Sequence, residues 1–248
     1  PLTQACGSAT NVQAAYRFMD HEDVQFETIL QPHYAATEAR ISELGEGTVV
    51  LVAQDTTSLN YSHLEIEGIG PIGSTPDGAQ GLHLHSSLSL TEQGVPLGFL
   101  DAKCWARDPQ DFGQSAERRA WPIEDKESYR WIESYRAVAA VQKRNPHIRL
   151  VSVGDREADF YELFENALRD PKGPGLLVRA KNNRQLEDEQ ERLFETAMAL
   201  PVAGHVSVPL PRQKDRPARL ARLAIRYATV TLRPPKDKAK LPALTVQI

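Results

Sequence analysis

Two aspartates in this chain each follow a short apolar run that is typical of a buried strand. Asp55 closes the run that begins at Val49, and Asp155 closes the run that begins at Leu150. In open α/β sheets, functional groups gather where strands end, and parallel neighbours would bring these two carboxylates side by side. Two close carboxylates repel each other unless one is protonated or a cation lies between them. Such oxygen ligands suit Mg²⁺ or Mn²⁺, and a pair of these ions can support the phosphoryl transfer of nucleases and strand transferases.

Other interpretations of the two aspartates stay open at this point. Both could be turn or helix-cap residues, because Asp55-Thr56-Thr57-Ser58 and Asp155-Arg156-Glu157 are good turn and N-cap sequences. A two-carboxylate glycosidase would need aromatic platforms beside the aspartates and no metal, yet no tryptophan adjoins either residue. His83 and His85 are two residues apart and could form a metal pair, but a second set of ligands at matching spacing is absent, so we expect them to face solvent.

The composition is that of an ordinary soluble chain. It has 248 residues, 41% of them hydrophobic and 25% charged, which argues against disorder, collagen and a disulfide-stapled miniprotein. No apolar run is long enough for a membrane helix, and the two cysteines, Cys6 and Cys104, lie far apart. We therefore expect no membrane association and a cytoplasmic location. The chain starts at Pro1 rather than Met and stops within a strand-like run at Ile248, so we expect a fragment.

Charge is distributed unevenly along the chain. The net charge is −4, yet residues 204–240 contain ten Lys or Arg against two Asp. A segment with this excess could bind nucleic-acid phosphates whatever their sequence, or could simply be a solvated basic loop.

The hydrophobic pattern predicts the elements that must position the aspartates. Helical spacing marks two runs within residues 11–44, with Pro32 expected to kink or divide the second, and further helices at 126–144, after Asp155, and at 184–200. Buried strands are predicted at 48–53, 148–153 and 176–178, an antiparallel hairpin at 82–105, and β-rich structure from Gly204 onward. This order indicates an α/β fold in which a mixed sheet is flanked by helices.

The two aspartate segments resemble a known family. Gln54–Tyr61 and Gly154–Asp159 are similar to the two aspartate motifs of the IS-four family of bacterial cut-and-paste DNA transposases, of the Tn-five-like type. The similarity continues in preserved order through Ala15–Phe18, Leu64–Gly73, Gly81–Ser86, Cys104–Pro109, Asp125–Ser128, Val178–Lys181 and Arg216–Arg219.

The resemblance implies a fold, a reaction and a set of partners. It implies a ribonuclease-H-like catalytic core at residues 45–183, preceded by the tail of a helical DNA-binding region at 1–44 and followed by a helix and a β-rich insertion at 184–248. It also implies a three-carboxylate site for two Mg²⁺ or Mn²⁺ ions, with Asp55 and Asp155 in the two aspartate positions. The partners would be double-stranded DNA, both transposon ends and target, with a homodimer on DNA for the full-length protein.

The resemblance also assigns DNA contacts and leaves one position unfilled. Seven residues are interpreted as DNA-binding: Arg17, Arg179, Lys181, Arg184, Arg216, Arg219 and Arg222. The glutamate of the family lies in a Tyr-two-Arg-three-Glu-six-Lys pattern, which this chain does not contain. We therefore expect an incomplete and inactive catalytic core, and the alternative is a non-catalytic DNA-binding remnant of a transposase.

Overall fold

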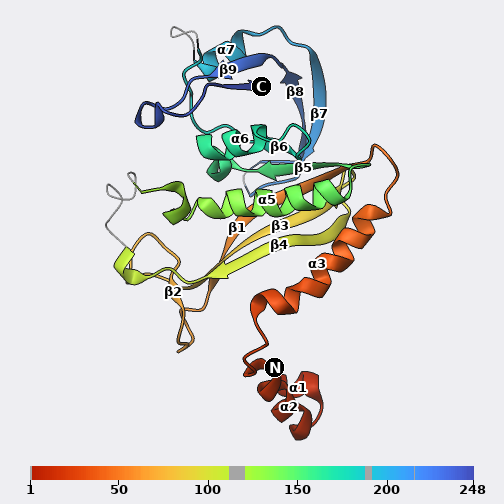
Figure 1. Ribbon diagram of the computed structural model, residues 1–248, viewed down its shortest axis with the longest axis vertical. Helices are drawn as coiled ribbons and strands as arrows, with labels where there is room; N and C mark the ends of the chain where they lie inside the picture. Colours follow the sequence, from red (N-terminus) through yellow and green to blue (C-terminus); the bar gives the residue numbers. More distant parts are fainter. Residues whose placement is uncertain (1, 112–120, 188–191, 215) are drawn as a thin grey trace. The chain divides into compact units, whose positions relative to one another are not determined.

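The computed structural model describes residues 2–111, 121–187, 192–214 and 216–248, and these form two compact units (Figure 1). The first unit comprises residues 1–158 and 172–178, and the second comprises residues 159–171 and 179–248. Each unit has a hydrophobic core of its own. No helix among the described residues is both long and apolar enough to cross a membrane.

The first unit is built on a mixed six-stranded sheet. Its order is β2-β3-β1-β5-β6, with β4 paired to β3. β3 runs antiparallel to β1, β2 and β4, whereas β5 is parallel to both β1 and β6. The mixed α/β architecture predicted from the sequence is thereby confirmed. The strands are β1 (Val49–Asn60), β2 (Gly70–Pro71), β3 (Gln80–Thr91), β4 (Pro96–Trp105), β5 (Arg149–Gly154) and β6 (Gly175–Val178).

Strand β1 is longer than its apolar run predicts. The prediction that the strand stops at Gln54-Asp55 is wrong, because pairing with β3 continues from Asp55 opposite Ser86 to Asn60 opposite Gly81. The β-branched Thr56 and Thr57 suit an extended backbone, so the strand outlasts the hydrophobic segment. Only the parallel pairing with β5 stops where the sequence suggested, at Gln54 opposite Gly154.

The predicted hairpin is present as β3 and β4, but its buried face is the polar one. The side chains of His83, His85, Ser87 and Ser89 are buried, whereas the alternating leucines of β3 are only half-buried. The expectation that the two histidines face solvent is therefore wrong. Their face of the sheet is the one against which α5 packs, and its aromatic and polar side chains provide partners for the imidazoles.

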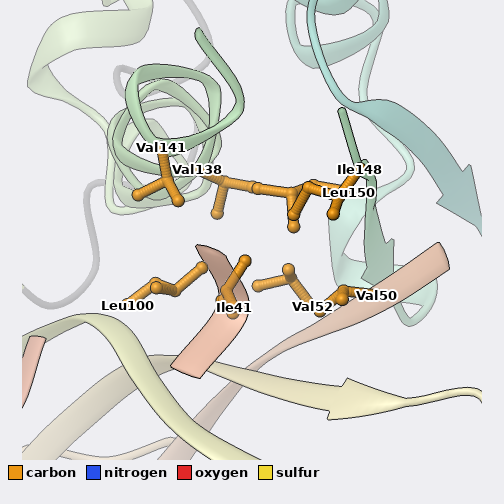
Figure 2. Packing of buried hydrophobic residues seen from close by; sticks show 8 residues of the cluster. All are labelled: Ile41, Val50, Val52, Leu100, Val138, Val141, Ile148 and Leu150. Atoms are coloured by element: carbon orange, nitrogen blue, oxygen red, sulfur yellow. The ribbon is translucent and has the colours of Figure 1, made fainter. Parts of the chain in front are cut away.

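Two helices pack on the sheet of the first unit. α3 (Phe26–Ser42) contacts β4, and α5 (Tyr129–Arg144) contacts β4, β5, β3 and β1. The core between them is purely aliphatic (Figure 2). Removing each such side chain from water contributes about 1.5–3 kcal/mol, so this layer holds the strands in register. Its members are Ile41, Val50, Val52, Leu100, Val138, Val141, Ile148 and Leu150.

Among the described residues the N-terminal region contains three helices, of which α1 (Leu2–Cys6) precedes the predicted range. α1 and α2 (Ala9–Met19) contain no buried residue. α3 continues through Pro32, which lies in its second turn, so the expected division of this helix does not occur. As the seventh residue of the helix, Pro32 removes one intrahelical backbone hydrogen bond, and the helix continues past it.

The second unit combines two short helices with two antiparallel ribbons. Its core centres on Tyr161, whose hydroxyl donates to the carbonyl oxygens of Leu232 and Pro242 at 3.1 and 2.7 Å. The predicted helix at 184–200 is shorter than expected in the described residues, and positions 188–191 lie outside them. The elements are α6 (Tyr161–Leu168), α7 (Leu193–Ala199), β7 (Gly204–Leu210), β8 (Arg219–Ile225), β9 (Thr229–Leu232) and β10 (Leu244–Gln247).

Candidate functional site: two aspartates on adjacent parallel strands

Asp55 is placed on the open face of β1 by the alternation of that strand. Val50, Val52 and Gln54 point into the core under α5, so Asp55, one residue further, points to the opposite face and is exposed. Its cross-strand neighbour on β3 is Ser86. Within the described residues the Asp55 carboxylate forms no ion pair, so it is available to bind a ligand.

Asp155 directly follows β5, the parallel neighbour of β1. The parallel register pairs Gln54 with Gly154, and the next residue along each strand is an aspartate. Ser152 and Gly154 are buried while Asp155 is exposed, so the alternation of β5 matches that of β1. One oxygen of Asp155 accepts a hydrogen bond from the backbone N–H of Glu157 at 2.7 Å. This turn contact uses one oxygen and leaves the other free.

The two carboxylates provide part of a ligand set for a hard divalent cation. Mg²⁺ is commonly bound through one or two carboxylates together with waters and substrate phosphates, so exposed Asp55 and Asp155 on adjacent strands fit it. Among the described residues no group of three or more His, Cys, Asp or Glu side chains is arranged to hold a metal ion. A third protein carboxylate is therefore not part of the described arrangement.

Side chains on the opposite face hold the backbone on both sides of Asp55. Gln54 donates from Nε2 to the Ser152 hydroxyl at 2.8 Å, which ties β1 to β5. The Thr56 hydroxyl lies 2.9 Å from Nδ1 of His85, which ties β1 to β3. Because both neighbours of Asp55 are fixed in this way, its carboxylate projects from a rigid stretch of strand.

His85 is the most strongly perturbed titratable group of this layer. Burial lowers the pKa of His85 to about 4, and the carboxylates of Asp101 and Asp55 oppose this shift. The imidazole is therefore neutral at physiological pH. Its ring lies 4.7 Å from the Trp131 ring of α5 in an edge-on arrangement.

Gly154 is required next to Asp155 because the space there is already filled. A Cβ atom at this position would lie 2.5 Å from the Ala158 Cβ and 3.0 Å from Cζ3 of Trp131. The close packing brings α5 directly against the end of β5. Trp131 consequently lies next to Gly154, which precedes Asp155. It also lies next to His85, whose imidazole contacts Thr56, the residue after Asp55.

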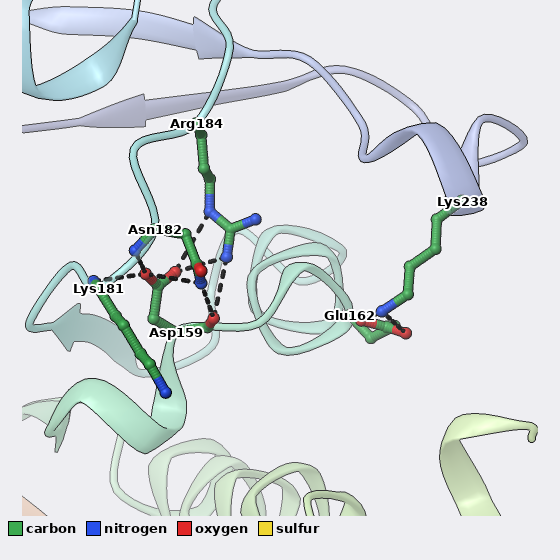
Figure 3. Close-up of polar contacts among 6 residues, drawn as sticks. All are labelled: Asp159, Glu162, Lys181, Asn182, Arg184 and Lys238. Atoms are coloured by element: carbon green, nitrogen blue, oxygen red, sulfur yellow. Dashed lines mark hydrogen bonds and ion pairs between the residues drawn. The ribbon is translucent and has the colours of Figure 1, made fainter. Parts of the chain in front are cut away.

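Arg184 has a structural partner within the second unit (Figure 3). Its guanidinium pairs with the Asp159 carboxylate at 2.5 Å, and the two side chains are only 9% and 2% exposed. Asp159 also accepts hydrogen bonds from the backbone N–H groups of Lys181 and Asn182, both at 2.6 Å. The Asp159 carboxylate thus organises the loop after β6. Arg184 is held in that loop by its ion pair with Asp159. Its role in DNA binding stays a prediction.

Arg179 and Lys181 lie beyond the end of β6, which stops at Val178. Both residues are exposed. In Figure 3 the Lys181 side chain extends away from the Asp159 carboxylate. The strand itself is not buried as predicted, since Leu177 is 59% exposed at this edge of the sheet.

The remaining candidate DNA contacts are exposed but do not form a single face. β7 and β8 make an antiparallel ribbon in which Arg219 pairs with Leu210 and Arg222 with Ser207. Because Arg219 and Arg222 are three residues apart on one strand, they project from opposite faces of the ribbon. Arg216 lies in the turn of the same ribbon, and Arg17 lies on α2. The basic side chains thus lie on both faces of the ribbon and do not form a single basic face.

The site contains residues that sequence reasoning did not single out. The sequence pattern predicts a solvent-facing His85 and singles out neither Trp131 nor Asp159. The sequence pattern that could reveal the buried histidines is the alternation of histidine and serine with leucine in β3. This pattern allows either face of the strand to be buried. Only the position of α5 decides between the two faces.

Comparison with known proteins gives one solved structure of note. No family model matches the chain. The chain is similar to a Mos1 transposase, solved as a paired-end complex with the left transposon end, at 11% identity and a TM-score of 0.25. The similarity covers 71% of this chain and 53% of that chain, so the present sequence spans about half the length of that transposase.

Proposed function

We propose that this protein is the catalytic core of a DNA transposase of the IS-four type, with a ribonuclease-H-like fold. The observation that supports the proposal is the parallel register of β1 and β5, which pairs Gln54 with Gly154, the residues that directly precede Asp55 and Asp155. The sequence motifs around both residues support the same interpretation. A turn or cap role alone would explain the Asp155 contact with Glu157, but not a second exposed carboxylate beside it.

Asp55 and Asp155 would hold Mg²⁺ or Mn²⁺. Such ions activate an attacking hydroxyl and stabilise a leaving oxygen at a phosphodiester. The chain itself contributes position: Gln54 and Thr56 fix the backbone around Asp55, and Gly154 lets α5 pack against the end of β5. The overall reaction would cut transposon ends and join them to target DNA, with the full-length protein acting as a homodimer.

Exposed cations of the β7–β8 ribbon would contribute sequence-independent contacts to DNA phosphates. Phosphates attract these cations, and the counterions released on binding make the affinity fall as salt rises. Arg179 and Lys181 would add to the same effect. If about four to six cations reach phosphates, the log–log dependence of affinity on salt should have a slope of roughly −4 to −5.

A non-catalytic DNA-binding remnant is the second candidate. The observation that favours it is that no group of three metal-ligating side chains occurs in the described part of the chain. The two candidates agree on DNA binding and differ in whether Asp55 and Asp155 bind a divalent cation. Either way, two aspartates alone would leave the chain unable to cleave transposon ends efficiently.

The DNA-binding part of the proposal can be tested by fluorescence anisotropy with a short duplex of arbitrary sequence. Replacing Arg216, Arg219 and Arg222 with Ala should flatten the salt slope by about 2 to 3, since each lost phosphate contact removes about 0.9. The control replaces Lys143, Arg169 and Lys172, three exposed cations elsewhere in the chain, and should leave the slope unchanged. Absence of binding, or equal effects of the two triple variants, would overturn the proposed role of the ribbon.

A further inference from the structure

Arg130, the second residue of α5, has a half-buried guanidinium with most of its hydrogen-bonding capacity unused. The guanidinium carbon lies 3.8 Å from the centroid of the Trp105 ring. Among the described residues its hydrogen bonding is limited to a 3.4 Å contact from Nη1 to the carbonyl oxygen of Glu127. A guanidinium has five N–H donors, so several of them have no acceptor among the described residues.

The nearest carboxylate is already bound by another arginine. Glu127 receives two hydrogen bonds from Arg107, at 2.6 and 2.7 Å, in the paired geometry that guanidinium and carboxylate groups favour. The indole N–H of Trp105 donates to the same carboxylate at 3.4 Å. Arg107 and Glu127 therefore neutralise each other, and Arg130 remains as an excess positive charge. Burial lowers the pKa of Arg130, the carboxylates of Glu127 and Glu133 raise it, and Arg107 lowers it further.

This excess charge lies at the same end of the sheet as the two aspartates. Trp131, the next residue of α5, packs against His85 and against Gly154, which precedes Asp155. The electrostatics agree with this placement, because Asp55 raises and Arg130 lowers the pKa of His85. Glu157, two residues beyond Asp155, likewise raises the pKa of Arg107. Arg130 thus lies on the α5 side of the sheet near the end of β5, whereas Asp55 is exposed on the opposite face.

We propose that Arg130 is an anchor for a backbone phosphate of a bound nucleic acid. A guanidinium binds a phosphate through two parallel N–H donors, which an ammonium group cannot do. Stacking on Trp105 holds the Arg130 side chain in place before the ligand arrives, so little rotamer entropy is lost on binding. The identity of the ligand as DNA rests on the proposed function, whereas the phosphate chemistry rests on Arg130 and its surroundings.

Inorganic phosphate tests the anchor without DNA and without metal. In EDTA, phosphate titrated against sodium chloride of matched ionic strength should give a saturable change in tryptophan fluorescence, because Trp105 lies against the guanidinium. Arg130→Gln should abolish this change, and Arg136→Gln should not. Arg136 is the matched control: it is on the same helix, is exposed, and lies 5.7 Å from the Tyr129 ring. The same response in wild type and Arg130→Gln, or no response in either, would overturn the proposal.

A second measurement asks whether the anchor is used by DNA. With a short duplex in EDTA, Arg130→Gln should make the salt slope shallower by about 0.9, the value for one phosphate, while Arg136→Gln keeps the wild-type slope. Arg130→Lys should restore the slope but not the full affinity, because it keeps the charge and loses the paired donors. Thermal unfolding of each variant checks that the fold is intact. An unchanged slope in Arg130→Gln contradicts the anchor but leaves metal binding by Asp55 and Asp155 unaffected, so the two proposals fail separately.

Discussion

Replacing Asp159 with Asn should destabilise the second unit far more than a surface charge change would. The Asp159 carboxylate accepts from two backbone N–H groups and from the Arg184 guanidinium, and both side chains are almost fully buried. An Asn amide turns its NH₂ group either toward the backbone donors or toward Arg184, so donors face donors on one side. Breaking a buried pair by removing one partner costs about 3–5 kcal/mol, and we expect about 3–4 kcal/mol for this variant.

The measurement is urea-induced unfolding followed by circular dichroism, combined with a double-mutant cycle. Arg184→Met alone should cost about 2–3 kcal/mol, because Asp159 keeps its two backbone partners. The double variant should cost less than the sum of the single costs by about 1–3 kcal/mol, as expected for residues in direct contact.

The surface pair Glu165 and Arg169 provides the matched control within the same unit. It is one helical turn apart on α6, at 2.7 Å, with Arg169 mostly exposed. Glu165→Gln should cost no more than about 0.5 kcal/mol. An Asp159→Asn cost as small as that of the control, or strictly additive single costs, would refute the reasoning that this carboxylate organises the loop after β6.

Two further predictions concern the packing behind the aspartates. His85 has a folded-state pKa of about 4 against an ordinary value of 6.5, so between these pH values the unfolded chain binds a proton that the folded chain does not. The free energy of unfolding should therefore fall by about 3 kcal/mol as pH drops from about 6.5 to about 4. In denaturant titrations His85→Gln should show a flatter pH dependence than the wild type. Parallel pH profiles for the two proteins would contradict this prediction. Gly154→Ala should cost about 1–3 kcal/mol because its Cβ would collide with Ala158 and Trp131, whereas Gly204→Ala, where nothing lies within 4 Å, should be close to neutral. Equal melting temperatures for these two alanine variants would argue against tight packing at the end of β5.

Some of this arrangement follows from sequence alone. The apolar runs before Asp55 and Asp155 indicate two buried strands, and they prove to be parallel neighbours. The hairpin of β3 and β4, the helix α5 and the β-rich C-terminal part were also predicted, because their periodicity and turn residues are strong local signals.

Other features depend on tertiary contacts that no local pattern encodes. The sequence of β3 alternates leucine with histidine and serine, and either set could have faced the core. The choice falls to α5, whose Trp131 packs against His85. The partnership of Asp159 with Arg184 joins residues 25 positions apart across β6, so no spacing rule reveals it. Leu177 likewise reads as a buried strand residue, but β6 lies at the edge of the sheet.

Binding of Mn²⁺ tests the central claim, that Asp55 and Asp155 share a divalent cation, most directly. Free Mn²⁺ can be followed by electron paramagnetic resonance as the ion is titrated into the protein, alone and with duplex DNA present. A shared site predicts that Asp55→Asn, Asp155→Asn and the double variant all lose the same bound ion, since each removes an essential ligand. Asp77→Asn, at an exposed aspartate elsewhere in the first unit, should bind as the wild type does. Wild-type Mn²⁺ binding in both single variants would contradict the account.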